Sequence, residues 1–303
     1  MPVRVDGATA PSETSTPRGG RNGRLAIIVL AVLVATVVGV VVGSLIVRAT
    51  GSATPSDPAP PPPGQGPSTS STQAPRVVEA LPRSGVEAGG GGISNIYELR
   101  TGFPKTTDGA VQAAMNFLIV DVGPAYYHQS HYEAIQAYMF ASPEARQKMG
   151  YSQATVDAMR AEYQVNDQGQ PLTDGKPDPG KRIWDAVYLQ YGAYRIVEAS
   201  PTEVRVMMWG PYVYGVDAKD ATSTTNLHIG WTLADITVNW VDGDWRQSGN
   251  KAYPASEVPK PADPRQVVTS FAERADLLGT DQGWTLPANA VETDTPELQL
   301  PGK

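Results

Sequence analysis

The 303-residue chain contains no cysteine, and its first 96 positions contain no aromatic residue. The lack of thiols excludes a disulfide scaffold, a cysteine-ligated metal site and a cysteine nucleophile. Basic residues are also few, since 24 Lys and Arg face 31 Asp and Glu, which gives a net charge of -7. This balance argues against a nucleic-acid-binding protein with a broad basic face. Every Phe, Trp and Tyr lies at or after Tyr97, so the chain divides into parts that differ in character.

Residues 25–47 form a run of 23 residues without a charge, rich in Val, Ile and Leu. A helix rises 1.5 Å per residue, so this run spans the roughly 30 Å hydrocarbon core of a membrane. The alternative is a cleaved signal peptide, whose apolar region is about 7–15 residues long. This run is longer, and Arg48 follows it where a small-residue cleavage site belongs. We therefore expect an uncleaved transmembrane helix over residues 25–47.

The arginine bias around this run sets its expected orientation. Residues 1–24 carry four Arg against two acids, while Arg48 is the only basic residue between the run and Arg76. The positive-inside rule predicts a cytoplasmic tail over residues 1–24 and an extracytoplasmic C-terminal part of a single-pass cell-membrane protein. Within the span, small residues at four-residue spacing are candidates for helix–helix association: Ala35, Gly39 and Gly43. The alternative is that these residues have no role in association, because Gly and Ala are common in transmembrane helices.

The segment after the predicted span is rich in proline. Residues 49–75 hold eight Pro and no Val, Ile, Leu, Met or aromatic residue, so they have no means of forming a core. We expect a disordered Pro/Gly/Ser-rich linker over residues 48–96, whose main use is as a spacer. O-linked glycosylation and recognition by an SH3-type domain are the alternatives that this composition leaves open.

Hydrophobic periodicity predicts helices first and strands afterwards. Caps and apolar stripes indicate four helices. The first covers residues 109–122, with Thr106, Thr107 or Asp108 as its cap. The second begins at Gln129 or Ser130, the third at Pro143 after the cap Ser142, and the fourth after the cap Ser152. Alternating apolar residues then predict an antiparallel meander, in which Asp242-Gly243 matches a two-residue type I′ hairpin turn. In the run 227–241 the alternation changes phase, which predicts a β-bulge at Ala234-Asp235.

This order of elements indicates an α+β domain over residues 97–250, with helices packed on a curved antiparallel sheet. Residues 251–303 are expected to be a C-terminal extension with one amphipathic helix, residues 265–278, and a disordered end. That helix has to bury its apolar stripe, so we expect it to dock on the sheet, and binding of a partner is the alternative.

Asp235 is a candidate functional residue in the predicted strands, because this acid stands in the middle of an apolar run. If the curved sheet encloses a pocket, Asp235, Trp231 and Trp240 are the candidate pocket residues. The alternative is that Asp235 turns outward or bonds neighbouring backbone amides. His128 and His131 are spaced for a zinc site only if further ligands converge on them, and an exposed pair is the simpler interpretation. We expect no catalytic residue, no metal and no cofactor.

Two stretches carry a family resemblance: residues 102–111, GFPKTTDGAV, and the hairpin of residues 236–246, ITVNWVDGDWR. Together with the predicted anchor, they resemble bitopic actinobacterial proteins of conjugative and integrative elements. More distantly, the chain resembles the nuclear-transport-factor-2-like, TcpC-like domains of type IV secretion, which implies that the α+β domain is cone-like. The resemblance covers residues 102–247 and does not include the linker or the C-terminal extension.

The resemblance implies a membrane-anchored, non-enzymatic component of a conjugation or type IV secretion-like assembly. Its exported domain is then expected to contact other membrane or envelope proteins, with homo-oligomerisation possible and no direct contact with nucleic acid. Two alternatives remain open: an exported small-ligand-binding or enzymatic cone domain, and a cell-envelope scaffold. The ligand alternative predicts a pocket lined by Trp and Tyr around a buried acid.

Overall fold

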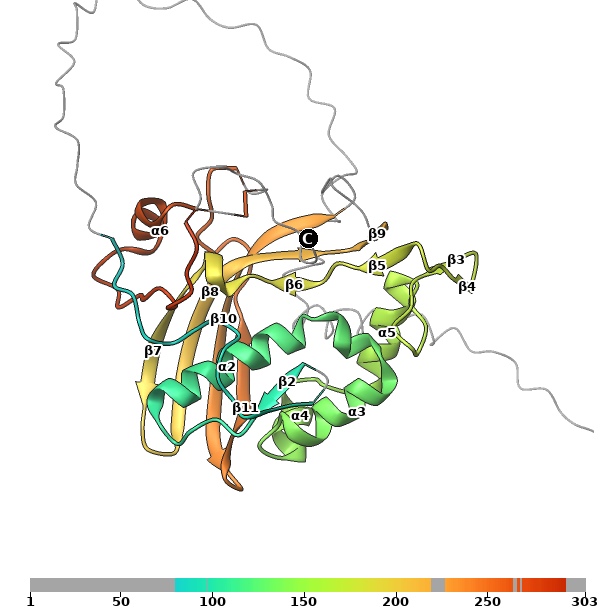
Figure 1. Ribbon diagram of the computed structural model, residues 1–303, viewed down its shortest axis with the longest axis horizontal. Coiled ribbons are helices and arrows are strands. Elements are labelled where there is room, and N and C mark those ends of the chain that lie inside the picture. Colours follow the sequence, from blue (N-terminus) through green and yellow to red (C-terminus); the bar gives the residue numbers. More distant parts are fainter. Residues whose placement is uncertain (1–79, 97, 219–226, 264–265, 268, 293–303) are drawn as a thin grey trace, which may run out of the picture.

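The computed structural model describes residues 80–96, 98–218, 227–263, 266–267 and 269–292. They form an α+β domain in which helices pack on a strongly curled antiparallel sheet, as the sequence predicted (Figure 1). The predicted span at residues 25–47, with Ala35, Gly39 and Gly43, lies outside this range. Among the described helices, none combines the length and apolarity that a membrane crossing requires.

The helical layer matches the predicted positions and uses the predicted caps. The side-chain oxygens of Thr106, Ser142 and Ser152 each accept a hydrogen bond from the backbone N–H three residues further on. Such caps satisfy donors that the first helical turn leaves unpaired. The elements are α2 (Thr107–Asp121), the 3-10 turn η1 (Pro124–Tyr127), α3 (Gln129–Tyr138), α4 (Pro143–Lys148) and α5 (Gln153–Tyr163).

The main sheet has the order β11-β10-β8-β6, and β7 also pairs with β8. Its strands are β6 (Ala186–Val187), β7 (Ala193–Ala199), β8 (Glu203–Tyr214), β10 (His228–Val241) and β11 (Asp244–Ala252), with the turn η2 (Leu189–Tyr191) before β7. Three short two-stranded pairs lie outside it. They are β1 (Ser94–Ile96) with β2 (Leu99–Thr101), β3 (Leu172–Thr173) with β4 (Lys176–Pro177), and β5 (Lys181–Ile183) with β9 (Val216–Ala218).

The hairpin between β10 and β11 has the predicted turn. Val241 pairs with Asp244 across two loop residues. Asp242 and Gly243 have φ values of 52° and 84°, and positive φ at both central positions defines type I′. This turn matches the right-handed twist of the flanking strands.

The predicted bulge at Ala234-Asp235 is wrong. The register between β10 and β8 runs without a shift from His228 to Asn239. The irregularity lies on β11, where Thr237 pairs with Gly249 but Val238 pairs with Gln247, leaving Ser248 as the extra residue. The change of phase in β10 therefore has a different cause.

That cause is burial of the sheet on both faces. Even-numbered residues of β10, such as Ile236 and Val238, belong to the core under the helices. Odd-numbered residues, such as Trp231 and Leu233, pack in a second cluster with the C-terminal segment. Because successive strand side chains point to opposite faces, an apolar run that serves two cores changes phase without any extra residue.

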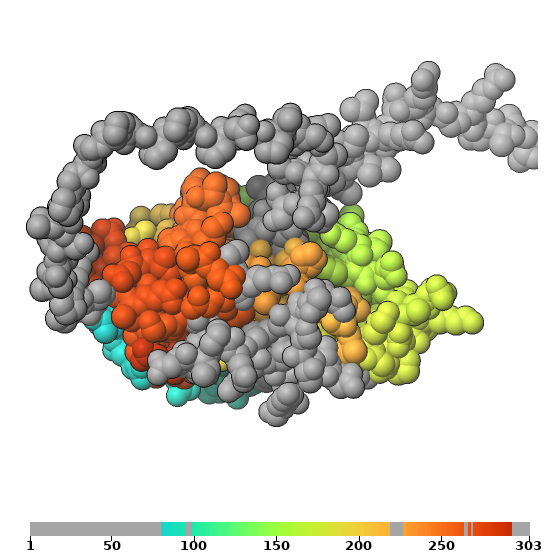
Figure 2. Space-filling model, turned by 90° about the horizontal axis from the view of Figure 1, so that it is seen from above, coloured from blue at the N-terminus to red at the C-terminus, as the bar shows by residue number. Residues whose placement is uncertain are grey.

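The C-terminal segment covers the second face of the sheet, as docking of its helix predicted. α6 (Phe271–Leu278) begins at Ser270, whose hydroxyl accepts from the Glu273 N–H, so the predicted start at residue 265 is wrong. A Ser-x-x-Glu sequence at residues 270–273 is the signature of this cap. Figure 2 shows the C-terminal segment in orange and red as a continuous part of the surface, at the opposite end from β3 and β4.

The folded unit begins before the predicted boundary at residue 97. Leu81 and Val86 are buried in the two cores. Backbone hydrogen bonds join Ser84 to Leu286 and Ala288 to Val86, at 2.9 and 2.7 Å. The described part of the predicted linker, from residue 80, therefore packs against the C-terminal segment rather than extending from the domain.

Asp244 ties the start of the helical layer to the hairpin. Its buried carboxylate accepts hydrogen bonds from the backbone N–H groups of Gly102, Phe103 and Trp245, at 2.8, 3.1 and 2.9 Å. We expect Asp244→Ala to lower the free energy of unfolding by about 2–3 kcal/mol, because it leaves buried donors unpaired. Urea unfolding measures this, with Asp242→Asn as the control, since Asn tolerates positive φ. Equal losses in the two variants would contradict the assignment.

Candidate functional site

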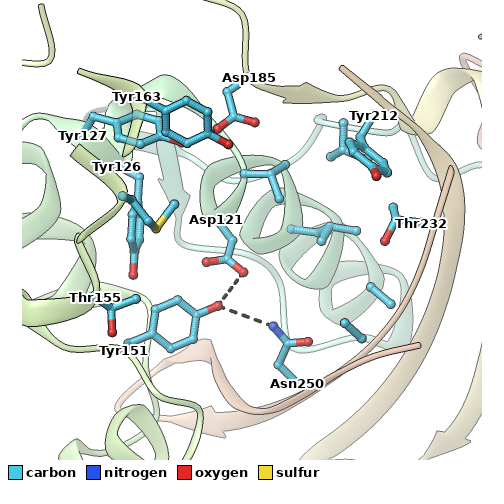
Figure 3. Close-up of a pocket in the computed structure, with 16 residues that line it drawn as sticks. Asp121, Tyr126, Tyr127, Tyr151, Thr155, Tyr163, Asp185, Tyr212, Thr232 and Asn250 are labelled. Carbon is cyan, nitrogen blue, oxygen red and sulfur yellow. Dashed lines mark hydrogen bonds between the residues drawn. The ribbon is translucent and has the colours of Figure 1, made fainter. Parts of the chain in front are cut away.

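A cavity of about 90 Å³ lies between the curled sheet and the helices (Figure 3). Side chains from α2, η1 and α5 form one side, and side chains from β6, β8, β10 and β11 form the other. The lining residues are Leu118, Asp121, Val122, Tyr126, Tyr127, Tyr151, Thr155, Met159, Tyr163, Asp185, Val187, Tyr212, Thr232, Ala234, Asn250 and Ala252. Most of this surface is apolar or aromatic, which is the usual composition of a ligand pocket.

Asp121 is the last residue of α2, and its carboxyl group borders the cavity. The Tyr151 hydroxyl donates a hydrogen bond to it, and the Asn250 amide donates to the same hydroxyl oxygen at 3.4 Å (Figure 3). Burial raises the pKa of Asp121 to about 7, against the hydrogen bond from Tyr151, which lowers it. Desolvation disfavours the charged form of a carboxyl group, so the acid holds its proton at a far higher pH than usual.

Asp185 is the second acid of the cavity and stands between β5 and β6. The Tyr127 hydroxyl donates to its Oδ2 at 2.5 Å. Burial raises the pKa of Asp185 to about 7, and the charge of Asp121 raises it further, while the bond from Tyr127 lowers it. Both acids keep some accessible surface although protein surrounds them, because they face the cavity.

Five tyrosines give the cavity its aromatic character: Tyr126, Tyr127, Tyr151, Tyr163 and Tyr212. Two pairs meet edge to face, with ring centroids 5.5 Å apart for Tyr127 and Tyr163 and 6.0 Å apart for Tyr126 and Tyr151. Burial raises the pKa of the three most enclosed hydroxyls, those of Tyr126, Tyr127 and Tyr151, so all three stay protonated.

Basic side chains are absent from the described lining of the cavity, which contains no Lys, Arg or His. Arg160 is a buried cation on α5, the helix that supplies Thr155, Met159 and Tyr163 to the lining. Its own side chain does not line the cavity. It donates to the Tyr127 carbonyl at 2.7 Å and to Gln129 Oε1 at 2.9 Å, and it pairs with Asp157. The two acids therefore share a cavity in which tyrosine hydroxyl groups donate hydrogen bonds to them.

The candidate pocket residues from the sequence lie elsewhere in the fold. Asp235 is buried on the opposite face of the sheet, where the Arg205 Nε lies 2.9 Å from each of its carboxylate oxygens. Trp231 stacks on Trp209, with centroids 4.3 Å apart, beneath the C-terminal segment. Trp240 packs edge to face on Trp245 in the main core. The structure does not bring Asp235, Trp231 and Trp240 into one pocket.

The histidine pair also forms no metal site among the described residues. The rings of His128 and His131 stack with centroids 4.1 Å apart. In the described part of the chain, no cluster of three or more His, Asp or Glu side chains is arranged to hold a metal ion.

Sequence reasoning missed the two acids of the cavity. From the sequence alone, Asp121 is interpreted as the polar end of a helix, and Asp185 as part of the connection between the helices and the strands. The available signal was an acid within the apolar stretch of residues 117–122, together with tyrosines clustered at residues 126, 127, 151 and 163. Which of these side chains meet depends on how the helices and strands around the cavity pack, and hydrophobic periodicity does not contain that information.

Comparisons with protein-family models, with curated proteins and with solved structures find no match. The fold is an α+β half-barrel covered by helices, and its candidate site is an acidic, tyrosine-lined cavity.

Proposed function

We propose that this chain is a single-pass membrane protein whose exported, cone-like domain binds a small molecule in the tyrosine-lined cavity. The observation that carries the proposal is the cavity itself. Protein interiors are packed so that few voids exceed one water molecule, whereas this one has room for several. Polar groups with shifted pKa values converge on it, which is typical of binding and catalytic sites.

The energetic cost of the two acids supports the same function. Burying a carboxyl group away from any cation destabilises a fold, and an apolar residue of similar size avoids this cost. Asp121 and Asp185 both border the cavity rather than a solid core. A ligand that binds to these carboxyl groups would explain why acids occupy both positions.

The volume limits the kind of ligand. Sites for drug-sized molecules measure about 300–1,000 Å³, well above the roughly 90 Å³ found here. The proposed ligand is therefore a molecule of few non-hydrogen atoms, or a small group at the end of a larger one. This size gives no support to an enzyme that acts on a large substrate.

Filling the cavity tests the proposal. Ala234 of β10 is buried and lines the cavity, so Ala234→Leu extends a side chain into it. We expect small-molecule fragments that bind the full-length protein in ligand-observed NMR to lose at least tenfold in affinity. Ala272→Leu, at an exposed position of α6, is the matched control. Absence of any binding fragment, or binding that Ala234→Leu leaves unchanged, would contradict the proposal.

A second candidate is the non-enzymatic role in a conjugation or type IV secretion-like assembly. The observation that favours it is the order of a charge-free 23-residue run, a Pro-rich segment and a folded domain, together with the family resemblance. Residues 49–75, if extended, hold the domain up to about 80 Å from the membrane. Such a reach suits contacts with other envelope proteins or with further copies of the chain.

Deleting the gene from a transfer-proficient strain tests this role. The assembly role predicts that DNA transfer falls and that the full-length chain restores it. Undiminished transfer would remove the conjugation role without bearing on ligand binding.

A further inference from the structure

We infer that the cavity binds a small organic cation, of the methylated ammonium class, between Asp121 and Asp185. This inference rests on the proposed ligand-binding function and names the chemistry of its ligand. Three features of the cavity carry it: its acids, its lack of bases and its aromatic lining.

The charged groups of the lining are all acidic. Among the described residues that line the cavity, Asp121 and Asp185 are the only ionisable side chains besides the tyrosines, and none is a Lys, Arg or His. A buried carboxylate is stabilised by a cation far more than by neutral donors. Because the described lining supplies no cation, a positively charged ligand is the partner that these acids lack.

The aromatic lining suits the same ligand. Five tyrosines surround the acids, with Tyr126, Tyr127 and Tyr163 on the helical side and Tyr212 on the sheet (Figure 3). Aromatic rings attract cations through their electron-rich faces, and cages of such rings bind quaternary ammonium groups.

The two acids are coupled through their charges, since ionised Asp121 disfavours ionisation of Asp185. The two acids therefore do not ionise independently. An ionised acid in this cavity attracts a cation and repels an anion.

Several other groups act on this pair. Tyr151 bonds Asp121, and Tyr127 bonds Asp185. Tyr126 interacts with the charge of Asp121, and Tyr163 and Tyr214 interact with the charge of Asp185. Glu162 on α5 also acts on Tyr127 and Tyr163, and it adds negative charge at this end of the domain.

A neutral carbonyl compound is the competing ligand, because a protonated Asp121 or Asp185 donates a hydrogen bond to a carbonyl oxygen. The two ligands differ in their response to pH. A cation requires an ionised acid and binds more tightly as pH rises through 7. A carbonyl compound requires the protonated acid and binds more weakly over the same interval.

Calorimetric titration of the full-length protein separates these cases. The probes are tetramethylammonium and methylammonium chloride, with acetone as the neutral probe, at pH 6 and pH 8 and constant ionic strength. Tetramethylammonium has no proton to lose, so any effect of pH arises in the protein. We expect the association constant of at least one cation to be about tenfold higher at pH 8, since an acid with a pKa of about 7 is mostly ionised there.

Three variants complete the experiment. Asp121→Asn and Asp185→Asn should each weaken cation binding at least tenfold at pH 8, and circular dichroism checks that they are folded. Asp276→Asn, on the exposed side of α6 at the opposite face of the sheet, should bind as the wild type does.

Each of the other outcomes contradicts one specific part of the inference. Acetone binding that is tighter at pH 6, without cation binding, overturns the cation and leaves the ligand-binding function in place. Cation binding that survives in both cavity variants overturns the site. Absence of binding by all three probes overturns the cation inference, and the fragment experiment with Ala234→Leu then decides the ligand-binding function separately.

Discussion

Replacing either acid of the cavity by asparagine should make the protein more stable above pH 7. Asp121→Asn and Asp185→Asn keep an oxygen that accepts the hydrogen bond from Tyr151 or Tyr127, but they carry no charge to bury. Most substitutions of buried residues destabilise a protein, so a gain here is a distinctive result. Binding sites commonly hold groups that function requires and stability does not.

The sign and size of this effect follow from linkage. Below pH 3.8, the ordinary pKa of an aspartate, the acid is protonated in the folded and unfolded states alike. Between pH 3.8 and about 7 the unfolded state loses the proton first, so the stability of the folded state falls as pH rises. Each unit of pKa shift corresponds to about 1.4 kcal/mol, so each acid lowers the stability above pH 7 by up to about 4 kcal/mol.

Urea unfolding of the wild type and the variants at pH 4, 6 and 8 measures this difference. The variants should show a smaller loss of stability between pH 4 and pH 8 than the wild type. Asp276→Asn changes an exposed acid and should follow the wild-type profile. Parallel profiles for all four proteins would show that neither cavity acid has a raised pKa.

Removing the Arg274 side chain is the second change with a large expected effect. Arg274 is 0% exposed and holds the C-terminal segment against the sheet. Its guanidinium donates to the Thr269 hydroxyl and carbonyl, at 2.9 Å each, and to the carbonyls of Gln190, Gly192 and Val291. Burial lowers the pKa of Arg274 to about 10, so the side chain stays charged at neutral pH.

Arg274→Met should lower the free energy of unfolding by about 3–5 kcal/mol, because several buried carbonyls lose their donor together. The apolar face beneath the segment, around Trp209 and Trp231, should also become accessible. Limited proteolysis then cuts the C-terminal segment faster than in the wild type. Lys260→Met, at an exposed site of the same segment, should have little effect. Equal proteolysis of both variants would contradict the role of Arg274.

Local signals predicted the individual elements well. The caps at Ser142 and Ser152 and the Asp242-Gly243 turn depend on hydrogen bonds and φ values within four residues, which the sequence displays directly. The cap of α2, Thr106, is one of the three adjacent residues that the sequence offered for that position. The order of helices before strands indicated the α+β class for the same reason.

Two-sided burial of the sheet is where sequence reasoning failed. An apolar run that changes phase has two physical causes, an extra residue or a second core, and the residues of the run do not distinguish them. The second core is supplied by the C-terminal segment, whose helix was expected to dock on the sheet and which packs on Trp231 and Leu233. The same error drew attention to Asp235, whose partner is Arg205.

The central claim is that the acidic, tyrosine-lined cavity is a ligand site, and a crystal structure of the protein grown with tetramethylammonium tests it most directly. The account predicts density for the cation among the tyrosine rings, with its nitrogen between the carboxyl groups of Asp121 and Asp185. A cavity that contains only ordered water, or that neighbouring side chains fill, would contradict it.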